Sequence, residues 1–228
     1  MDPIEEQKEY YRRRAGEYDE WWFRSGRWAL PPEGKRLWLA DIAEVEAALR
    51  RFGPAGDVLE LACGTGLWTH HLARYTARVT AVDASAEMID RNRARVGGRV
   101  DYVQADIFDW TPPARRFDVC FFSYWISHVP DERLAAFWAK VAAALRPGGR
   151  VFLIDSYHAE PRPDRTQERL LNDGRRFTVV KRFWQPDELA AHAAGLGWTL
   201  DARATRYDTI LYAAGHRAER VPSSRGQG

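Results

Sequence analysis

Segments typical of buried strands alternate with segments of helical periodicity along the chain, and this alternation limits the fold more than any other feature. The strand-like runs lie at residues 57–61, 78–82, 100–104, 117–122 and 150–155. The stretches with apolar residues at helical spacing lie at residues 38–52, 67–75, 85–96 and 131–145. Strands that alternate with helices predict an α/β fold, with a mostly parallel sheet that helices cover on both faces.

The rhythm changes after residue 155. The Pro147-Gly148-Gly149 segment is expected to form a turn that leads into the strand at residues 150–155. Residues 158–173 are polar and contain proline, so we expect a surface loop or insertion there. Residues 177–183 are expected to be extended. Pro186 begins a short helix over residues 186–194, in the first-turn position that proline tolerates.

Two strand-like runs close the folded part of the chain. They lie at residues 198–202 and 207–213 without a helical pattern between them, which predicts an antiparallel hairpin. The segment His216–Gly228 contains few apolar residues, so we expect it to be disordered.

Composition excludes several classes of protein. With 228 residues and 45% apolar residues the chain suits one globular domain. Its formal net charge is only +2 and its charges are scattered, which argues against a nucleic-acid partner. The densest basic run, Arg12-Arg13-Arg14, is predicted to be a solvated helix face.

We expect a cytoplasmic protein that is a monomer or a homodimer. No signal peptide and no apolar run near eighteen residues is evident, so no membrane segment is predicted. Cys63 and Cys120 both fall in apolar stretches that read as buried strands or strand ends. Two thiols form neither a disulfide framework nor a zinc site, so we expect a reducing compartment and no metal site.

A glycine turn follows the first strand and carries the strongest functional signal. Ala62, Gly64 and Gly66 are small residues that let the backbone approach a ligand closely and adopt unusual torsions. Asp83 ends the second strand, about twenty residues on, as a ribose-binding carboxylate should, and Asp106 ends the third. The carboxyl ends of parallel strands form the crevice where open α/β sheets bind ligands. The G-x-G-x-x-G turn of nicotinamide and flavin enzymes is not present, which disfavours that class.

Five segments in order resemble the motifs of class I S-adenosylmethionine-dependent methyltransferases. Residues 60–66 (Glu-Leu-Ala-Cys-Gly-Thr-Gly) resemble motif I, and residues 79–85 with Met88-Ile89 resemble motif II. Residues 105–107 resemble motif III, residues 117–119 resemble the start of motif IV, and residues 145–150 resemble the motif before strand five. The resemblance covers residues 57–155.

The resemblance implies a Rossmann-like sheet of seven strands in the order 3-2-1-4-5-7-6, with strand seven antiparallel. It also implies a helical lid over the active site at residues 1–35, a methyltransferase domain at residues 36–215 and a tail at residues 216–228. The pattern Tyr11-x-x-x-Ala15-x-x-Tyr18-Asp19 resembles the N-terminal tyrosine pattern of small-molecule methyltransferases, in which this helix covers the site.

The cofactor implied is S-adenosylmethionine, which leaves as S-adenosylhomocysteine. By the resemblance, Asp83 binds both ribose hydroxyls and Asp106 accepts a hydrogen bond from the adenine amino group. The other residues expected at the cofactor are Tyr11, Tyr18, Ala62, Gly64, Gly66, Ala84, Met88, Ile107 and Ser123.

His128 is the candidate general base. It follows the fourth strand, where the methyl group points, and its ordinary pKa suits proton transfer near neutrality. A tyrosine of the lid, Tyr11 or Tyr18, could share or relay the proton. The alternatives are a loop histidine bonded to nearby backbone and tyrosines that only pack in the lid.

Aromatic residues suggest the acceptor. The chain holds ten Trp, nine Tyr and ten Phe, concentrated at residues 10–28 and 121–125. An aromatic wall favours a flat aromatic or heteroaromatic small molecule, although lid packing is the alternative. The residues expected at the substrate are Tyr18, Trp22, Phe23, Trp28, Tyr124, Trp125 and His128. The Asn/Asp-Pro-Pro-aromatic motif of nucleic-acid base methyltransferases does not follow strand four.

A narrower resemblance concerns residues 10–28 and 125–128. They are similar to bacterial enzymes that methylate C3 of an indole, as in tryptophan-derived diketopiperazines, and trigger pyrroloindoline closure. In that reaction His128 with a tyrosine would take the indole N–H proton. The alternatives are an O- or N-methyltransferase of another small molecule and, more remotely, a non-catalytic scaffold that binds S-adenosylmethionine.

Overall fold

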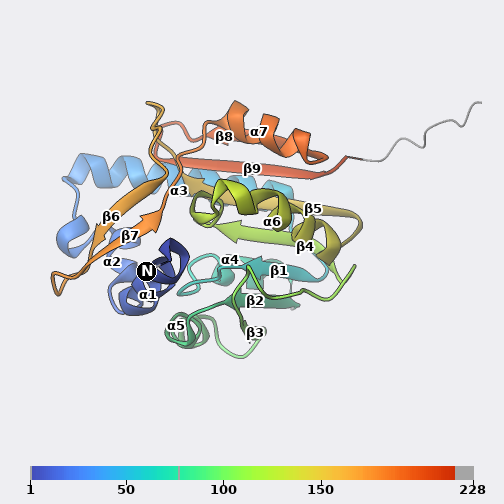
Figure 1. Ribbon diagram of the computed structural model, residues 1–228, viewed down its shortest axis with the longest axis horizontal. Coiled ribbons are helices and arrows are strands. Elements are labelled where there is room, and N and C mark those ends of the chain that lie inside the picture. Colours follow the sequence, from blue (N-terminus) through green and yellow to red (C-terminus); the bar gives the residue numbers. More distant parts are fainter. Residues whose placement is uncertain (1, 77, 219–228) are drawn as a thin grey trace, which may run out of the picture.

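Within residues 2–76 and 78–218, which the computed structural model describes, seven strands form one central sheet in the order β3-β2-β1-β4-β5-β9-β8 (Figure 1). These strands are β1 (Val58–Leu61), β2 (Val79–Asp83), β3 (Val100–Gln104), β4 (Phe117–Ser123), β5 (Leu145–Ser156), β8 (Trp198–Ala204) and β9 (Ile210–Arg217). Strands β1 to β5 are parallel, and β9 pairs antiparallel with both β5 and β8. The predicted sheet order and its antiparallel seventh strand, which is β9, are confirmed.

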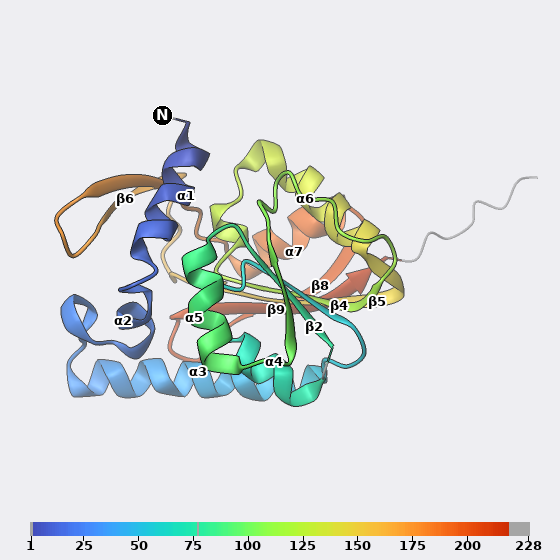
Figure 2. The same ribbon diagram turned by 90° about the horizontal axis from the view of Figure 1, so that it is seen from below.

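Helices cover both faces of this sheet (Figure 2). One face carries α3 (Pro32–Phe52), α4 (Thr69–Tyr75) and α5 (Ala86–Val96), and the other carries α6 (Asp131–Ala144) and α7 (Pro186–Gly195). Phe121 and Phe122 of β4 show how the strand serves both cores. They are fully buried neighbours whose side chains point to opposite faces, Phe121 toward Phe152 and Phe122 toward Phe137.

Local signals in the sequence set the helix ends. The Ser85 side chain accepts a hydrogen bond from the Met88 amide at 3.2 Å and so caps α5, as predicted. Gly53 ends α3 in the left-handed conformation, with φ at 61°. Helix α6 begins at Asp131 as expected, and its apolar stripe faces β4 and β5.

The Pro147-Gly148-Gly149 segment is part of β5 and not a separate turn before it. Strand β5 begins at Leu145, and its register with β4 shifts between Phe117 and Val119. Gly148 has φ at 76°, so the glycines allow the chain to bulge within the ladder.

The segment 158–173, expected to be a surface loop or insertion, is irregular up to residue 165 but contains a strand that the sequence analysis did not predict. Strands β6 (Thr166–Leu170) and β7 (Arg176–Val180) form an antiparallel hairpin that extends away from the main sheet beside α1 (Figure 2). The sequence Thr166–Leu170 alternates, but its inward side chains are polar, so the apolar period that marks a strand is missing. The extended conformation predicted from residue 177 corresponds to β7.

Two short helices precede α3. Asp2 caps α1 (Pro3–Arg14), and α2 (Tyr18–Phe23) and a 3-10 turn (Gly26–Trp28) lead into α3. Helix α1 lies between β7 and α5, over the carboxyl edge of the strands (Figure 2). Helix α3 starts inside the segment predicted as a lid, and the division into lid and body stays a prediction.

The remaining expectations concern thiols, tail and membrane. Cys63 and Cys120 are buried free thiols. His216 and Arg217 end β9, while residues 219–228 of the predicted tail lie outside the described residues. No helix among residues 2–76 and 78–218 has the length and apolar character to cross a membrane.

The β8–β9 pair provides a test of the fold. A Cβ added at Gly215 would lie 2.0 Å from the Thr199 carbonyl oxygen on the neighbouring strand. We expect Gly215→Val to destabilise the protein by about 1–3 kcal/mol, or several degrees in Tm. Gly195→Ala is the control, because its added Cβ meets no atom within 4 Å. Equal Tm values for the two variants in a thermal unfolding assay would contradict the β8–β9 pairing.

Candidate active site

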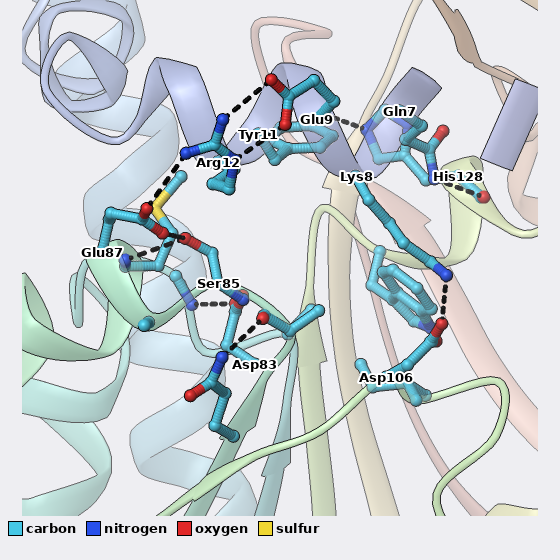
Figure 3. Close-up of a pocket in the computed structure, with 18 of the residues that line it drawn as sticks. Gln7, Lys8, Glu9, Tyr11, Arg12, Asp83, Ser85, Glu87, Asp106 and His128 are labelled. Carbon is cyan, nitrogen blue, oxygen red and sulfur yellow. Dashed lines mark hydrogen bonds and ion pairs between the residues drawn. The ribbon is translucent and has the colours of Figure 1, made fainter. Parts of the chain in front are cut away.

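A cavity of about 730 Å³ opens at the carboxyl edge of the sheet, beneath α1 (Figure 3). Its walls come from α1, from the turns after β1 to β4, and from the start of α5. The predicted cofactor and catalytic residues that line it are Tyr11, Tyr18, Ala62, Gly64, Asp83, Ala84, Met88, Asp106, Ile107, Ser123 and His128. The volume suits a cofactor-sized ligand.

The glycine turn after β1 forms the floor. Ala62 and Gly64 both have φ at 53°. This conformation is unfavourable for any residue that has a side chain. A Cβ at Gly64 would meet no atom within 4 Å, so the backbone here faces open space. Gly66 has a different role, because its added Cβ would lie 2.6 Å from Asn92 Oδ1. Gly66 therefore lets the turn pack against α5 and is not among the residues that line the cavity.

Asp83 stands at the end of β2, beside the glycine turn. Its Oδ2 accepts a hydrogen bond from the Gly64 amide and its Oδ1 accepts one from the Ser85 amide, each at 2.9 Å. Loss of hydration raises the pKa of Asp83, while these amide bonds favour the carboxylate. The carboxylate is thus fixed at the cavity wall with acceptor capacity left for hydroxyl groups.

Asp106 is held from two sides. Its Oδ1 accepts a hydrogen bond from the Phe108 amide at 2.8 Å, and Lys8 of α1 forms an ion pair with its Oδ2 (Figure 3). Met88 and Ile107, both buried, add apolar walls nearby. A carboxylate beside apolar walls fits a nucleobase. The pair with Lys8, which the sequence did not indicate, ties α1 to this end of the cavity.

His128 lies in the 3-10 turn Ile126–His128 after β4 and is buried. Its Nδ1 lies 2.6 Å from the Val180 carbonyl oxygen. Its Nε2 lies 2.8 Å from the Tyr11 hydroxyl, and Figure 3 shows His128 and Tyr11 in the wall of the cavity. Because a carbonyl can only accept, Nδ1 carries the proton and Nε2 accepts the hydrogen bond from Tyr11. The structure thus brings together two of the three predicted catalytic residues.

Positive charge surrounds this imidazole. Burial lowers the pKa of His128 well below its ordinary value, and the nearby charges of Lys181, Arg169 and Arg14 lower it further, against the bond to Val180. The ring is therefore neutral near pH 7 and able to accept a proton. Loss of hydration raises the pKa of Tyr11, so its hydroxyl stays protonated at rest.

A buried ion pair supports the His128 turn. Lys181 Nζ lies 3.2 Å from Asp155 Oδ1 and 2.8 Å from Ser127 Oγ, and Asp155 Oδ2 accepts a hydrogen bond from the Ser127 amide at 2.9 Å. Lys181 and Asp155 are 3% and 1% exposed. These bonds connect the ends of β5 and β7 to the turn, and so fix the position of the histidine.

Tyr18 lines the cavity with its ring centroid 6.4 Å from that of Tyr11. Within the described residues its hydroxyl makes no hydrogen bond to His128, and loss of hydration raises its pKa to about 12. Tyr18 is therefore placed as a wall of the cavity and not as a member of the proton relay.

Only part of the predicted aromatic wall reaches the cavity. Tyr124 and Trp125 line it, together with Phe108, which the sequence did not indicate. Trp22 lies at an adjoining small cavity, and its ring packs edge-on against Trp38 and Trp68 of the body.

Phe23 and Trp28 do not line the cavity. Phe23 is 52% exposed, and the Trp28 ring lies beside the guanidinium groups of Arg14 and Arg27. The alternative of lid packing describes much of the N-terminal cluster.

Helical phase explains which α1 residues the sequence analysis missed. Gln7 and Lys8 lie four and three positions before Tyr11 on one face of α1, and all three line the cavity. Arg14 follows on the same face. Arg12 and Arg13 are exposed as expected, but the prediction of a solvated run is wrong for Arg14, which is 5% exposed.

Comparison with known proteins agrees with this geometry. Residues 58–149 match the family described as "Methyltransferase domain". The ubiquinone biosynthesis O-methyltransferase of Xanthomonas axonopodis pv. citri is 33% identical over 140 residues, which are 59% of this chain and 55% of that protein. O-methyltransferase cnsE of Penicillium expansum is 34% identical over 122 residues, which are 50% of this chain and 44% of that protein. The chain spans about half the length of these curated relatives.

Two solved structures match over nearly the whole chain. The structure named "DhpI-SAH complex structure" is 38% identical, has a TM-score of 0.78, and is matched over 96% of this chain and 98% of its own. The structure named "DhpI-SAM-HEP complex" is 38% identical, with a TM-score of 0.79, over 94% and 97%. The chain belongs to the S-adenosylmethionine-dependent methyltransferases. The cavity of this methyltransferase has carboxylates and apolar walls that fit the cofactor. The roles expected of Asp83 at the ribose hydroxyls and of Asp106 at the adenine amino group stay predictions.

Asp83 provides the test of the cofactor site. We expect Asp83→Ala to weaken binding of S-adenosylhomocysteine by on the order of 1.5–3 kcal/mol, about 10- to 100-fold, because charge-assisted hydrogen bonds are lost. Asp101→Ala, on the exposed side of β3, is the control. Calorimetric titration of both folded variants decides, and an unchanged affinity for Asp83→Ala would rule out the assignment.

Proposed function

We propose that this methyltransferase transfers a methyl group to a proton-bearing oxygen of a small molecule, and that Tyr11 and His128 receive the proton. The single observation that carries the proposal is the hydrogen-bonded chain from Tyr11 through His128 to the Val180 carbonyl. It lies in the wall of the cofactor cavity, next to Ser123 at the end of β4. The O-methyltransferases among the relatives support an oxygen acceptor.

Bound S-adenosylmethionine supplies an electrophilic methyl group, and the electron pair of its C–S bond stays on the sulfur. The acceptor oxygen forms the new O–CH₃ bond while its proton passes to the Tyr11 oxygen. Tyr11 in turn gives its own proton to His128 Nε2, which is oriented to accept it. The Val180 carbonyl then stabilises the imidazolium through Nδ1–H. Helix α1 covers the cavity and limits access of water to these groups.

The position of the acceptor contributes to the rate, in addition to the transfer of its proton. Methyl transfer is an in-line displacement, so holding the acceptor oxygen behind the methyl group lowers the barrier. Gln7 donates a hydrogen bond to the His128 carbonyl at 3.2 Å and so ties α1 to the base. The lid helix therefore brings Tyr11 to its place together with the residues that cover the cofactor.

C3-methylation of an indole is the second candidate. Phe108 and Trp125 line the cavity with ring centroids 5.3 Å apart, which gives part of the aromatic wall that an indole needs. The same relay would take the N–H proton of the ring. Incubation with methyl-labelled cofactor and separate panels of hydroxylated small molecules and of indoles, with product analysis by mass spectrometry, distinguishes the two candidates. Labelled methyl groups on indoles, without any labelled O-methyl product, would overturn methyl transfer to oxygen.

The proton relay predicts that substitution of either of its two side chains lowers kcat. We expect His128→Ala to lower kcat by about 10²–10⁴-fold, because the proton acceptor is removed. Tyr11→Phe keeps the ring but breaks the relay, so it should also lower kcat while the affinity for S-adenosylhomocysteine stays within about twofold of wild type. Single-turnover kinetics with the acceptor found in the panel measure both. Full activity of either variant would contradict the proton relay.

The charges around His128 predict the pH profile. A lowered pKa keeps the imidazole neutral to lower pH, so the acid limb of kcat/KM should have its midpoint below about 6.5. The groups that face the ring are Tyr11 and Arg14 from α1, Arg169 from β6 and Lys181 after β7. Lys181→Met removes a positive charge and leaves Asp155 unpaired, so the midpoint should move up. Lys35→Met, exposed on α3, should leave it in place, and an unmoved midpoint in Lys181→Met would contradict this account.

A further inference from the structure

Arg14 is a buried cation without a counter-charge. It is 5% exposed, and among the residues that the structure describes no carboxylate lies within ion-pair distance of its guanidinium group. Aromatic rings surround it instead, with its Cζ 4.9 Å from the centroid of Tyr18, 5.5 Å from Tyr10 and 5.8 Å from Trp28. Its Nε is buried and has no acceptor. Rings can stabilise a guanidinium group in part, but they do not accept hydrogen bonds as an oxygen does.

A second cation, Arg169, lies on the β6–β7 hairpin. Arg169 lies on the inner side of β6, and in the described part of the chain it forms no ion pair. Its Nε is also buried without a partner. The charges of Arg14 and Arg169 act on both members of the relay: they oppose the rise that burial causes in the pKa of Tyr11, and they add to the fall that burial causes in the pKa of His128. The two guanidinium groups thus flank the proton relay from opposite elements.

Other polar atoms between α1 and the hairpin are unpaired as well. They are Gln7 Oε1, Tyr10 Oη and Gln167 Oε1, each buried. Gln167 and Arg169 are two positions apart on β6 and so share its inner side. The inner side also holds Phe177, whose ring lies 5.7 Å from that of Tyr10. Natural proteins leave few buried polar groups without partners, so a concentration of them beside a catalytic pair indicates a binding site.

We propose that the acceptor carries an oxyanionic group, a carboxylate or a phosphoryl group, that Arg14 and Arg169 bind between α1 and the β6–β7 hairpin. A planar guanidinium group matches both kinds of oxyanion with paired hydrogen bonds. This inference rests on the proposed function, since it names the class of molecule whose hydroxyl is methylated. The anionic group itself does not react. It fixes the acceptor so that its hydroxyl reaches Tyr11.

Anion binding would also strengthen the base. Burial lowers the pKa of His128, and three positive charges nearby lower it further; of these three groups, only Lys181 has a carboxylate partner among the described residues. A bound oxyanion offsets the charges of Arg14 and Arg169. The imidazole then becomes a better proton acceptor only when the acceptor molecule is in place.

Calorimetric titration of the protein saturated with S-adenosylhomocysteine tests the site. The probes are inorganic phosphate for the phosphoryl source, benzoate for the carboxylate source, and benzamide as the uncharged match of benzoate. We expect at least one anion to bind and benzamide to bind at least about tenfold more weakly. Binding of phosphate alone or benzoate alone supports the proposal and identifies the source. Anions that bind no better than benzamide overturn it.

Substitutions distinguish a binding site from packing. Arg14→Met and Arg169→Met should each weaken the favoured anion by about tenfold or more, and Arg14→Lys should weaken it less. Arg13→Met, an exposed position of the same helix, is the control and should bind as wild type does. Removing a buried unpaired cation should raise the Tm of Arg14→Met. A lowered Tm with unchanged anion affinity would mean that Arg14 only packs against the rings, and the proposal would then fail.

Turnover separates this proposal from the proposed function. The panel contains hydroxy acids and hydroxyl-bearing phosphate monoesters, each with its uncharged amide or alcohol counterpart, and methyl-labelled cofactor. Faster labelling of the anionic members, lost in Arg14→Met, supports both proposals. Equal labelling of the anionic members and their uncharged counterparts by wild type, unchanged in Arg14→Met, overturns the anion site and leaves methyl transfer standing. Anion binding through Arg14 without any labelled product keeps the anion site and overturns the proposed function.

Discussion

The site depends on the point in the sheet where the chain reverses its direction of winding, between β1 and β4. Strand β1 pairs with β2 on one side and β4 on the other, and the helices that follow these strands lie on opposite faces. The turns after β1 and β4 therefore diverge and leave a crevice at their carboxyl ends. Gly64, Asp83 and His128 belong to three different turns, yet all reach this crevice. Loss of the β1–β4 pairing would separate the cofactor half of the site from the base.

The two halves of the proposed site differ in charge and in origin. The cofactor half is built from the sheet and carries carboxylates, Asp83 and Asp106. The acceptor half, which is the anion site proposed above, lies between α1 and the β6–β7 hairpin, outside the main sheet, and carries two guanidinium groups, Arg14 and Arg169. Neither arginine is among the residues that line the cavity itself. The common fold therefore determines which cofactor can bind. In the proposal made above, these two added elements bind the anionic group of the acceptor.

The cofactor half could be predicted from the sequence because its signals are local. Asp83 and Gly64 each lie within a few residues of a strand end, so the strand pattern places them. The acceptor half depends on contacts between distant residues, such as Tyr11 with His128, 117 positions apart, and His128 with Val180, 52 positions apart. Strand β6 escaped prediction because its inner side chains, Gln167 and Arg169, are polar.

The hydrogen bond from His128 to the Val180 carbonyl has a consequence for how such enzymes can diversify. Val180 ends β7, so the same hairpin that faces the acceptor also selects which imidazole nitrogen carries the proton. Acceptor recognition and proton acceptance are therefore inherited as one module. A chimera that exchanged residues 157–184 for those of a relative would replace the acceptor wall and the tautomer control of the base together. A point change at Arg14 of α1 would alter recognition, while the Val180 carbonyl would still select the protonated nitrogen of His128.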